Sequence, residues 1–194
     1  GNAQISTSVK KFGTGSMAFD GSGDWLVTPD TDALDFGSGN FTAEAWVYFN
    51  SLANEAMIMG QWSGDTGGTT LSWALMLSSG SSGYLRLITS SNGSSVLFDL
   101  STSSTSFTLS TGQWYHIAAV RNGSTFTIYV DGTSRASTTN SSALYNATNN
   151  FTIGAESNTQ AQYLNGYIDD LRITKGVARY TANFTPPTAA FPNK

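Results

Sequence analysis

The sequence predicts an all-β protein, a two-sheet antiparallel sandwich with almost no helix. Roughly a dozen short stretches alternate apolar and polar side chains with the period of two that half-buried strands show. Turn signals made of Gly, Asn, Asp and Ser separate these stretches at spacings of roughly 8–12 residues. The chain shows no internal repeat, no heptad pattern and no alternation of strands with helices, so a parallel α/β sheet is not expected.

The composition indicates one packed domain. The chain has 194 residues, a length that single β-sandwiches reach, and no linker-like change of composition, so we expect residues 1–194 to form a single domain. Charged residues make up only 11%, so the surface must consist largely of Ser, Thr, Asn and Gly. The 12% aromatic and 39% hydrophobic residues favour a packed core over disorder.

Charge and cysteine content exclude several classes of function. The net charge is −4 and no cluster of Lys and Arg is present to neutralise phosphates, so no nucleic-acid partner is expected. No apolar run approaches the ~20 residues that span a bilayer, so we expect no membrane insertion. The chain has no cysteine, which rules out disulfides, thiolate zinc sites and a cysteine nucleophile.

A central hairpin over residues 113–133 is the clearest local signal. Asn122-Gly123 between two apolar runs is typical of a two-residue hairpin loop, and Asp131-Gly132 predicts a second turn. With Asn122 and Gly123 as the loop, Arg121 opposes Ser124. The expected apolar face then pairs Ala119 with Phe126, Ile117 with Ile128 and Tyr115 with Val130.

The remaining elements follow from alternation and from the residues that interrupt it. Residues 30–36 are expected to form a helical turn. The tail from Thr174 onward contains Pro186, Pro187 and Pro192, which cannot belong to a central strand because proline lacks the N–H. Besides the hairpin arms, the expected strands cover residues 5–9, 16–19, 25–28, 41–49, 57–62, 71–77, 84–89, 96–100, 107–109, 134–137, 151–155 and 166–173.

Residues 41–49 form the most regular expected strand. Alternation assigns one face to small and apolar side chains, beginning with Phe41, and the other to Thr42, Glu44, Trp46 and Tyr48. The first face is expected to lie in the core. The second carries a carboxylate between aromatic rings, which is unusual for a solvated face.

Five phrases resemble the laminin-G-like branch of the concanavalin-A-like jelly rolls, and they occur in that family's order. They are MAFDG at 17–21, FTAEAW at 41–46, QWYHIA at 113–118, IYVDG at 128–132 and GYIDDLRI at 166–173. The run at 172–187 is similar to versions in phage and marine bacterial proteins. The resemblance implies a jelly-roll sandwich, often a carbohydrate-binding or adhesion module within a larger secreted, cell-surface or virion protein.

Catalysis is not expected, and no residue is assigned a catalytic role. Glycoside hydrolysis needs two carboxylates ~5–10 Å apart, and the Glu-x-Asp-x-x-Glu string of the jelly-roll glucanases is absent here. Glu44 is alone on its strand, and the adjacent Asp169 and Asp170 are expected on opposite faces. His116 is the only histidine and is expected to be a hydrogen-bonded core residue. A glycoside hydrolase remains a distant alternative.

Structural calcium is the one cofactor to consider. Calcium takes carboxylate and carbonyl oxygens, and the resemblance implies that the first and last strands lie together. Asp20 and Asp169 are therefore the candidate ligands, with Asp170 as a substitute for the second. The alternative is that these carboxylates bind turn amides or pair with Lys and Arg.

Carbohydrate binding is the leading hypothesis, since aromatic faces contact the apolar surface of a sugar while amides and carboxylates bind its hydroxyls. Candidates occur in two polar loops and on one strand. For Trp46 plain core packing is the stronger alternative, and for Trp62 and Tyr163 core packing and sugar contact are both open. The candidates are Trp62 and Asp65, then Asn158, Gln160 and Tyr163, then Glu44 and Trp46 lining a concave face.

Two expectations concern partners and the tail. The second hypothesis for function is a structural or assembly domain that contacts neighbouring virion or surface protein chains. Arg172 is expected to be structural, beside the acidic pair at 169–170, and Arg179 and Tyr180 are expected to clamp the returning tail against the sandwich.

Overall fold

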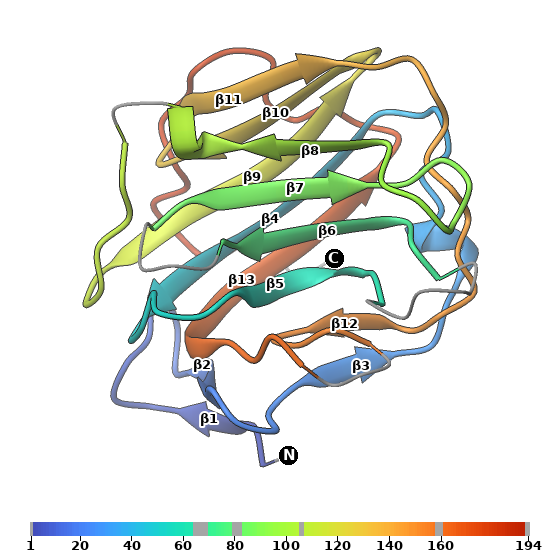
Figure 1. Ribbon diagram of the computed structural model, residues 1–194. Helices are drawn as coiled ribbons and strands as arrows, with labels where there is room; N and C mark the ends of the chain where they lie inside the picture. The colour runs from blue at the N-terminus through green and yellow to red at the C-terminus, as the bar shows by residue number, and fades with distance from the viewer. Residues whose placement is uncertain (1, 64–69, 79–82, 105–106, 158–160, 193–194) are drawn as a thin grey trace.

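Two antiparallel sheets stacked face to face make up the molecule (Figure 1). The computed structural model describes residues 2–63, 70–78, 83–104, 107–157 and 161–192, and thirteen strands lie within these ranges. The only helical segments there are two short 3₁₀ turns, η1 (Asp32–Leu34) and η2 (Thr102–Ser104). Neither has the length or apolarity of a membrane-spanning helix. The predicted all-β two-sheet sandwich is confirmed.

The first sheet has seven strands in the order β1-β2-β13-β4-β9-β10-β11. The strand that comes last in the sequence therefore lies in the middle of the sheet, between β2 and β4. The bounds are β1 (Gln4–Ser6), β2 (Ser16–Asp20), β4 (Phe41–Phe49), β9 (Trp114–Asn122), β10 (Thr125–Val130), β11 (Thr133–Thr139) and β13 (Asn165–Lys175).

The second sheet has six strands in the order β3-β12-β5-β6-β7-β8. Residues 107–109, expected to be a strand, lie in neither sheet. The bounds are β3 (Leu26–Thr28), β5 (Ala56–Gln61), β6 (Trp73–Leu77), β7 (Leu85–Thr89), β8 (Phe98–Ser101) and β12 (Phe151–Ile153).

The core lies between the sheets and is built by alternation. On β4, Phe41 and Phe49 are fully buried, and the Phe41 ring packs 6.0 Å from that of Trp73 on β6 of the opposite sheet. On the hairpin, Ile117 and Ile128 are also fully buried. The apolar faces predicted for β4 and for the hairpin are therefore confirmed.

The hairpin register differs from the expected one by two residues. Asn122 pairs with Thr125 and Ala119 with Ile128, so Gly123 and Ser124 are the loop residues. Gly123 has a φ of +60°, and a glycine at the first central position is what a type II′ turn requires. A shift of two residues leaves every side chain on its predicted face, because the period of a strand is two.

A bulge in β13 interrupts the alternation of side chains at Asp169 and Asp170. The prediction that these two carboxylates lie on opposite faces assumed a regular strand. Register shifts between Asp169 and Arg172, and Asp170 has a φ of +48°. Asp169 accepts hydrogen bonds from the amides of Lys11 (2.8 Å) and Phe12 (3.0 Å). Asp170 accepts one from the amide of Phe191 (2.7 Å). The two carboxylates thus hold segments near both ends of the chain to the last strand.

Residues 176–192, called the C-terminal tail below, cross the outer face of the seven-stranded sheet. The Thr42 hydroxyl on β4 donates to the carbonyl of Val177 at 3.0 Å. Farther along, the amide of Phe184 donates to the carbonyl of Gly132 at 2.8 Å, in the turn between β10 and β11. The tail therefore spans β4, β9 and β10 before it returns to β13 at Phe191.

Candidate functional site

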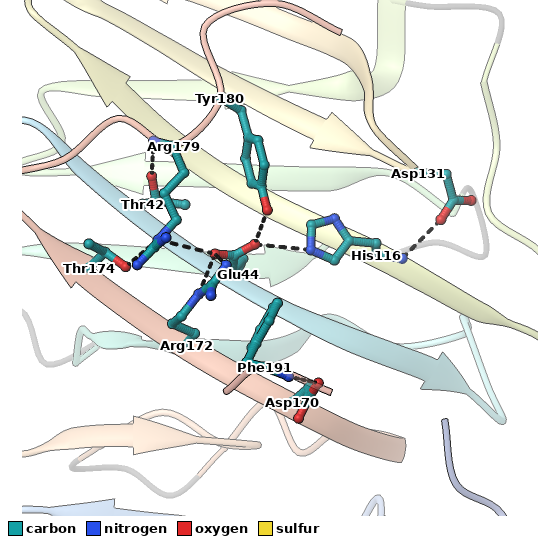
Figure 2. A network of polar contacts seen from close by, with 10 residues as sticks. All are labelled: Thr42, Glu44, His116, Asp131, Asp170, Arg172, Thr174, Arg179, Tyr180 and Phe191. Carbon is teal, nitrogen blue, oxygen red and sulfur yellow. Dashed lines mark hydrogen bonds and ion pairs between the residues drawn. The ribbon is translucent and has the colours of Figure 1, made fainter. Parts of the chain in front are cut away.

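A buried carboxylate organises the outer face of the seven-stranded sheet. Glu44 has no exposed surface. Its Oε2 is 3.1 Å from Nε2 of His116 and accepts a 2.7 Å hydrogen bond from the hydroxyl of Tyr180. Its Oε1 lies 2.7 Å from Nη2 of Arg172 and 3.9 Å from Nε of Arg179 (Figure 2). Both carboxylate oxygens therefore have partners, and three of the four partner residues lie on β13 or the tail.

These contacts set the charge of the network. Burial alone raises the pKa of Glu44, but hydrogen bonds from His116, Tyr180 and Arg172 outweigh burial, and the pKa is lowered. Burial, together with the hydrogen bond to Glu44, raises the pKa of Tyr180. Glu44 is thus ionised and Tyr180 is a neutral donor, which makes the pair an anchor for the tail.

Aromatic rings close the face above this network. The rings of Tyr180 and Phe184 stack at 3.5 Å, and the Phe184 ring meets the edges of His116 (5.6 Å) and Tyr129 (5.5 Å). The predicted clamp by Arg179 and Tyr180 is present, since the Arg179 amide also donates to the Thr42 hydroxyl at 3.0 Å. His116 is fully buried, as expected of a core histidine.

The expectation that Glu44 and Trp46 line an open concave face is wrong. Glu44 is 0% exposed and Trp46 is 5% exposed. Lys11 Nζ lies 3.8 Å from the Trp46 ring centroid, and the Phe12 ring meets it edge-on at 5.8 Å. The N-terminal segment covers Trp46 and the tail covers Glu44, so neither side chain can contact a sugar.

Trp62 is also withdrawn from solvent. It directly follows β5, as predicted, but it is only 8% exposed. It packs in a cluster with Met57, Met76 and Ile88. The core-packing interpretation, which the sequence left open, therefore applies to Trp62. The other residues of the predicted polar loops, Asp65, Asn158 and Gln160, lie outside the described residues.

The predicted calcium ligands lie at different positions along the length of β13. Asp20 pairs in register with Asn165, four residues before Asp169 on β13. Asp169 binds the amides of the N-terminal segment, which is the turn-amide alternative. Among the described residues, no group of three or more His, Cys, Asp or Glu side chains is arranged to hold a metal ion.

A polar pocket lies where β13 begins, beside β2. Its volume is ≈ 390 Å³. Amides and carboxylates dominate its lining, together with one tyrosine. The lining residues are Asn2, Gln4, Ala18, Phe19, Asp20, Asp24, Asn50, Asn165 and Tyr167. This group is called the polar pocket below.

An aromatic pair lies on the segments next to the polar pocket. The rings of Trp25 and Tyr163 are 6.5 Å apart at 38°, and both side chains are partly exposed. Trp25 directly follows Asp24 of the pocket, and Tyr163 comes two residues before Asn165. Tyr163 was a predicted sugar-binding residue. Trp25 was missed because it was interpreted only as the start of a strand, although a tryptophan beside an acidic turn was a usable signal.

The sandwich defines the chain as a jelly-roll protein of the concanavalin A type, and the sequence places it in a family. A laminin G-type family model, described as the concanavalin A-like lectin/glucanases superfamily, matches residues 20–179. The chain belongs to this superfamily. A search of curated proteins finds no match.

Solved structures share the fold. Domain 4 of AbnA, a GH43 extracellular arabinanase from Geobacillus stearothermophilus solved with arabinotriose, superimposes with a TM-score of 0.68 at 21% identity, over 92% of this chain and 77% of that one. Domains LG4-5 of the mouse laminin alpha1 chain give a TM-score of 0.57 at 14% identity, over 98% of this chain and 48% of that one. The binding domain of botulinum neurotoxin serotype D gives a TM-score of 0.63 at 18% identity, over 91% of this chain and 42% of that one. The chain thus spans less than half of the latter two.

Proposed function

We propose that this chain is a non-catalytic glycan-binding module whose ligand occupies the polar pocket and contacts the Trp25–Tyr163 pair. The observation that carries the proposal is the combination of an amide- and carboxylate-lined pocket with two partly exposed aromatic rings on the neighbouring segments. Sugar sites use this combination, because hydroxyls need hydrogen-bond partners while the C–H face of a sugar packs on an aromatic ring.

The pocket has a fixed wall and free polar groups. Asp24 accepts hydrogen bonds from the amides of Asn2 (2.7 Å) and Asp20 (3.2 Å), so both of its oxygens are used in shaping the wall. Asp20 uses only Oδ1, on the amide of Ser22 at 2.7 Å. The other oxygen of Asp20 and the side-chain amide of the exposed Asn50 have no hydrogen bond among the described residues, which leaves them for sugar hydroxyls.

The same contacts support binding without hydrolysis. A glycosidase needs a protonated carboxylic acid beside a second carboxylate. Asp24 accepts backbone-amide hydrogen bonds at both oxygens, which commits the side chain to the pocket wall. Glu44 is enclosed beneath the tail. The arabinanase domain that shares this fold was solved with a bound trisaccharide, which supports a saccharide as the ligand class.

We also propose that the module works outside the cell, on a cell surface or in a virion. The support is its fold, which it shares with parts of an extracellular arabinanase and of laminin. In that setting the chain would anchor a larger protein to a polysaccharide.

The proposal is tested by calorimetric titration with neutral oligosaccharides, arabinotriose first. Trp25→Ala and Asn50→Ala should each weaken binding, roughly tenfold for a lost contact worth about 1.4 kcal/mol. Asn54→Ala is the matched control, because Asn54 is an exposed asparagine in the same loop that does not line the pocket. Absence of binding to any glycan, or an equal loss with Asn54→Ala, would overturn the proposal.

A second candidate function, assembly through protein contacts, is favoured by the two sheet edges. Ile5 on edge strand β1 is 72% exposed and Val27 on edge strand β3 is 55% exposed. Ile5 also borders an apolar pocket of ≈ 320 Å³ between the two edges. Exposed apolar side chains on unpaired edges are typical contact points. Sedimentation at increasing concentration should show association that Ile5→Ser abolishes; a monomer throughout would count against assembly between copies.

A further inference from the structure

Another pocket, at the opposite end of β13 from the polar pocket, has three cations among its six lining residues. Its volume is ≈ 430 Å³. Three of the nine Lys and Arg residues of the chain meet there. The lining residues are Arg172, Ile173, Thr174, Lys175, Arg179 and Pro192, and this group is called the cationic pocket.

The cations retain unused hydrogen-bond donors. Arg172 directs Nε and Nη2 at Oε1 of Glu44. Arg179 donates from Nε to the Thr174 hydroxyl at 2.8 Å, and Lys175 donates from Nζ to the carbonyl of Asp32. Among the described residues, both Nη atoms of Arg179 have no acceptor. Guanidinium N–H groups left in this way are strong donors to an oxyanion.

The local charge is positive although the whole protein carries −4. Within the described residues, the only carboxylate within 4.0 Å of these three cations is Glu44, and Glu44 is enclosed beneath the tail. Asp35 and Asp170 lie near Lys175 and Arg172; burial raises the pKa of both acids, and the neighbouring cation offsets this only in part. Neither acid lines the pocket.

Packing holds the two guanidinium groups in place before a ligand arrives. The Arg172 guanidinium lies 3.6 Å from the ring centroid of Phe191 and is bound to Glu44. Arg179 is held at its amide by Thr42 and at Nε by Thr174 (Figure 2). Because these side chains are already ordered, binding an anion costs little further side-chain entropy.

We propose that the cationic pocket binds an oxyanion: a sulfate, phosphate or carboxylate group, either carried by an acidic saccharide or free in solution. The planar arginine donors match the paired oxygens of such groups, and Lys175 adds an exposed point charge at the rim. This site is separate from the polar pocket and does not depend on neutral-sugar binding there.

The test compares four ligands: a sulfated disaccharide, its unsulfated counterpart, inorganic sulfate and inorganic phosphate. Each is titrated into the protein at low ionic strength, and the Arg Nε–H signals are followed by NMR. The sulfated disaccharide should shift the signals of Arg172 and Arg179, and the unsulfated one should not. Lys175→Gln should weaken binding roughly three- to tenfold, the range expected for a lost charge-assisted contact. Lys10→Gln is the matched control: Lys10 is exposed and also donates to a backbone carbonyl, that of Thr7, at 3.0 Å.

Each outcome bears on the proposal. Tighter binding of the sulfated disaccharide than of inorganic sulfate identifies a saccharide as the source of the oxyanion, and equal binding identifies the free ion; both support the pocket. Equal shifts with the unsulfated sugar, no binding of any anion, or an equal loss with Lys10→Gln would overturn it. Asn50→Ala should leave anion binding unchanged, which separates failure here from failure at the polar pocket.

Discussion

The hydroxyl of Tyr180 donates a 2.7 Å hydrogen bond to Oε2 of Glu44, although the two residues are 136 positions apart in the sequence. This bond joins the C-terminal tail to the middle of β4. It converts what would be the open outer face of a sheet into an interior, and several measurable consequences follow from it.

Glu44→Gln should destabilise the protein by about 3–5 kcal/mol, because it leaves the Arg172 charge without its partner at a largely buried site. Urea denaturation measures the change. Glu55→Gln is the matched control, since the Glu55 side chain is 27% exposed and its partner Arg86 keeps Asp99, so the loss should stay within the range of about 0–1 kcal/mol of a partly exposed ion pair. Equal effects of the two variants would contradict the anchor role of Glu44.

The Glu44 contribution should be lost in acid. Its pKa in the folded protein is lowered from 4.5, so below about pH 4.5 the unfolded chain takes up a proton that the folded chain does not. The stability provided by Glu44 is therefore complete above that pH and declines as the pH falls toward the folded pKa. Melting temperatures of the wild type and Glu44→Gln should converge as the pH falls below about 4.5, whereas a constant difference would argue against this linkage.

Tyr180→Phe should cost about 1–3 kcal/mol, because it keeps the ring stacked on Phe184 but removes the donor to a buried carboxylate oxygen. The tail should also open more often, so trypsin should cut at Arg179 faster than in the wild type. Tyr145→Phe serves as the control, since the Tyr145 hydroxyl has no hydrogen bond within the described residues. Unchanged proteolysis of Tyr180→Phe would show that the ring stack alone holds the tail.

Substituting the two glycines that flank β10 should distinguish the cost of backbone strain from the cost of displacing the C-terminal tail. Gly123 and Gly132 both have positive φ, +60° and +73°. A Cβ on Gly123 meets nothing within 4 Å, whereas one on Gly132 would lie 1.8 Å from the carbonyl oxygen of Phe184. Gly123→Ala should cost about 1 kcal/mol of strain, and Gly132→Ala distinctly more, with loss of tail protection in hydrogen exchange. Equal costs would mean that the tail adapts freely.

Trp62→Ala should act on stability and not on sugar binding. Removing a buried tryptophan that packs on Met57 and Met76 is expected to cost about 3–5 kcal/mol. Glycan affinity of the folded fraction should stay at the wild-type value, in contrast to Trp25→Ala. A selective loss of affinity with normal denaturation would restore Trp62 as a ligand contact.

Most of the sheet is predictable from the sequence because alternation and turn residues are local signals. The bounds of β4 agree with the prediction residue for residue. The hairpin register was wrong by two residues because alternation cannot distinguish shifts of two, and only the type of turn at Gly123 decides between them.

The candidate site was less predictable because exposure depends on distant segments. Alternation correctly separated Glu44 and Trp46 from the core side of β4, but it carries no information about what covers the other side. Tyr180 and Lys11, which provide that cover, come from near the two ends of the chain. Asp20 likewise pairs with Asn165 and not with Asp169, and the register between β2 and β13 cannot be predicted from a local pattern.

The central place of β13 has a consequence for the order of folding. Among the described strands it is made last, yet it fills the gap between β2 and β4, with contacts such as Asp169 to Lys11 that close loops of 158 residues. A growing chain therefore holds two separate pieces of sheet, each with an unpaired edge, until β13 emerges. Completion of the sheet is slow on loop-closure grounds, and the exposed edges of β2 and β4 are where incomplete chains will aggregate.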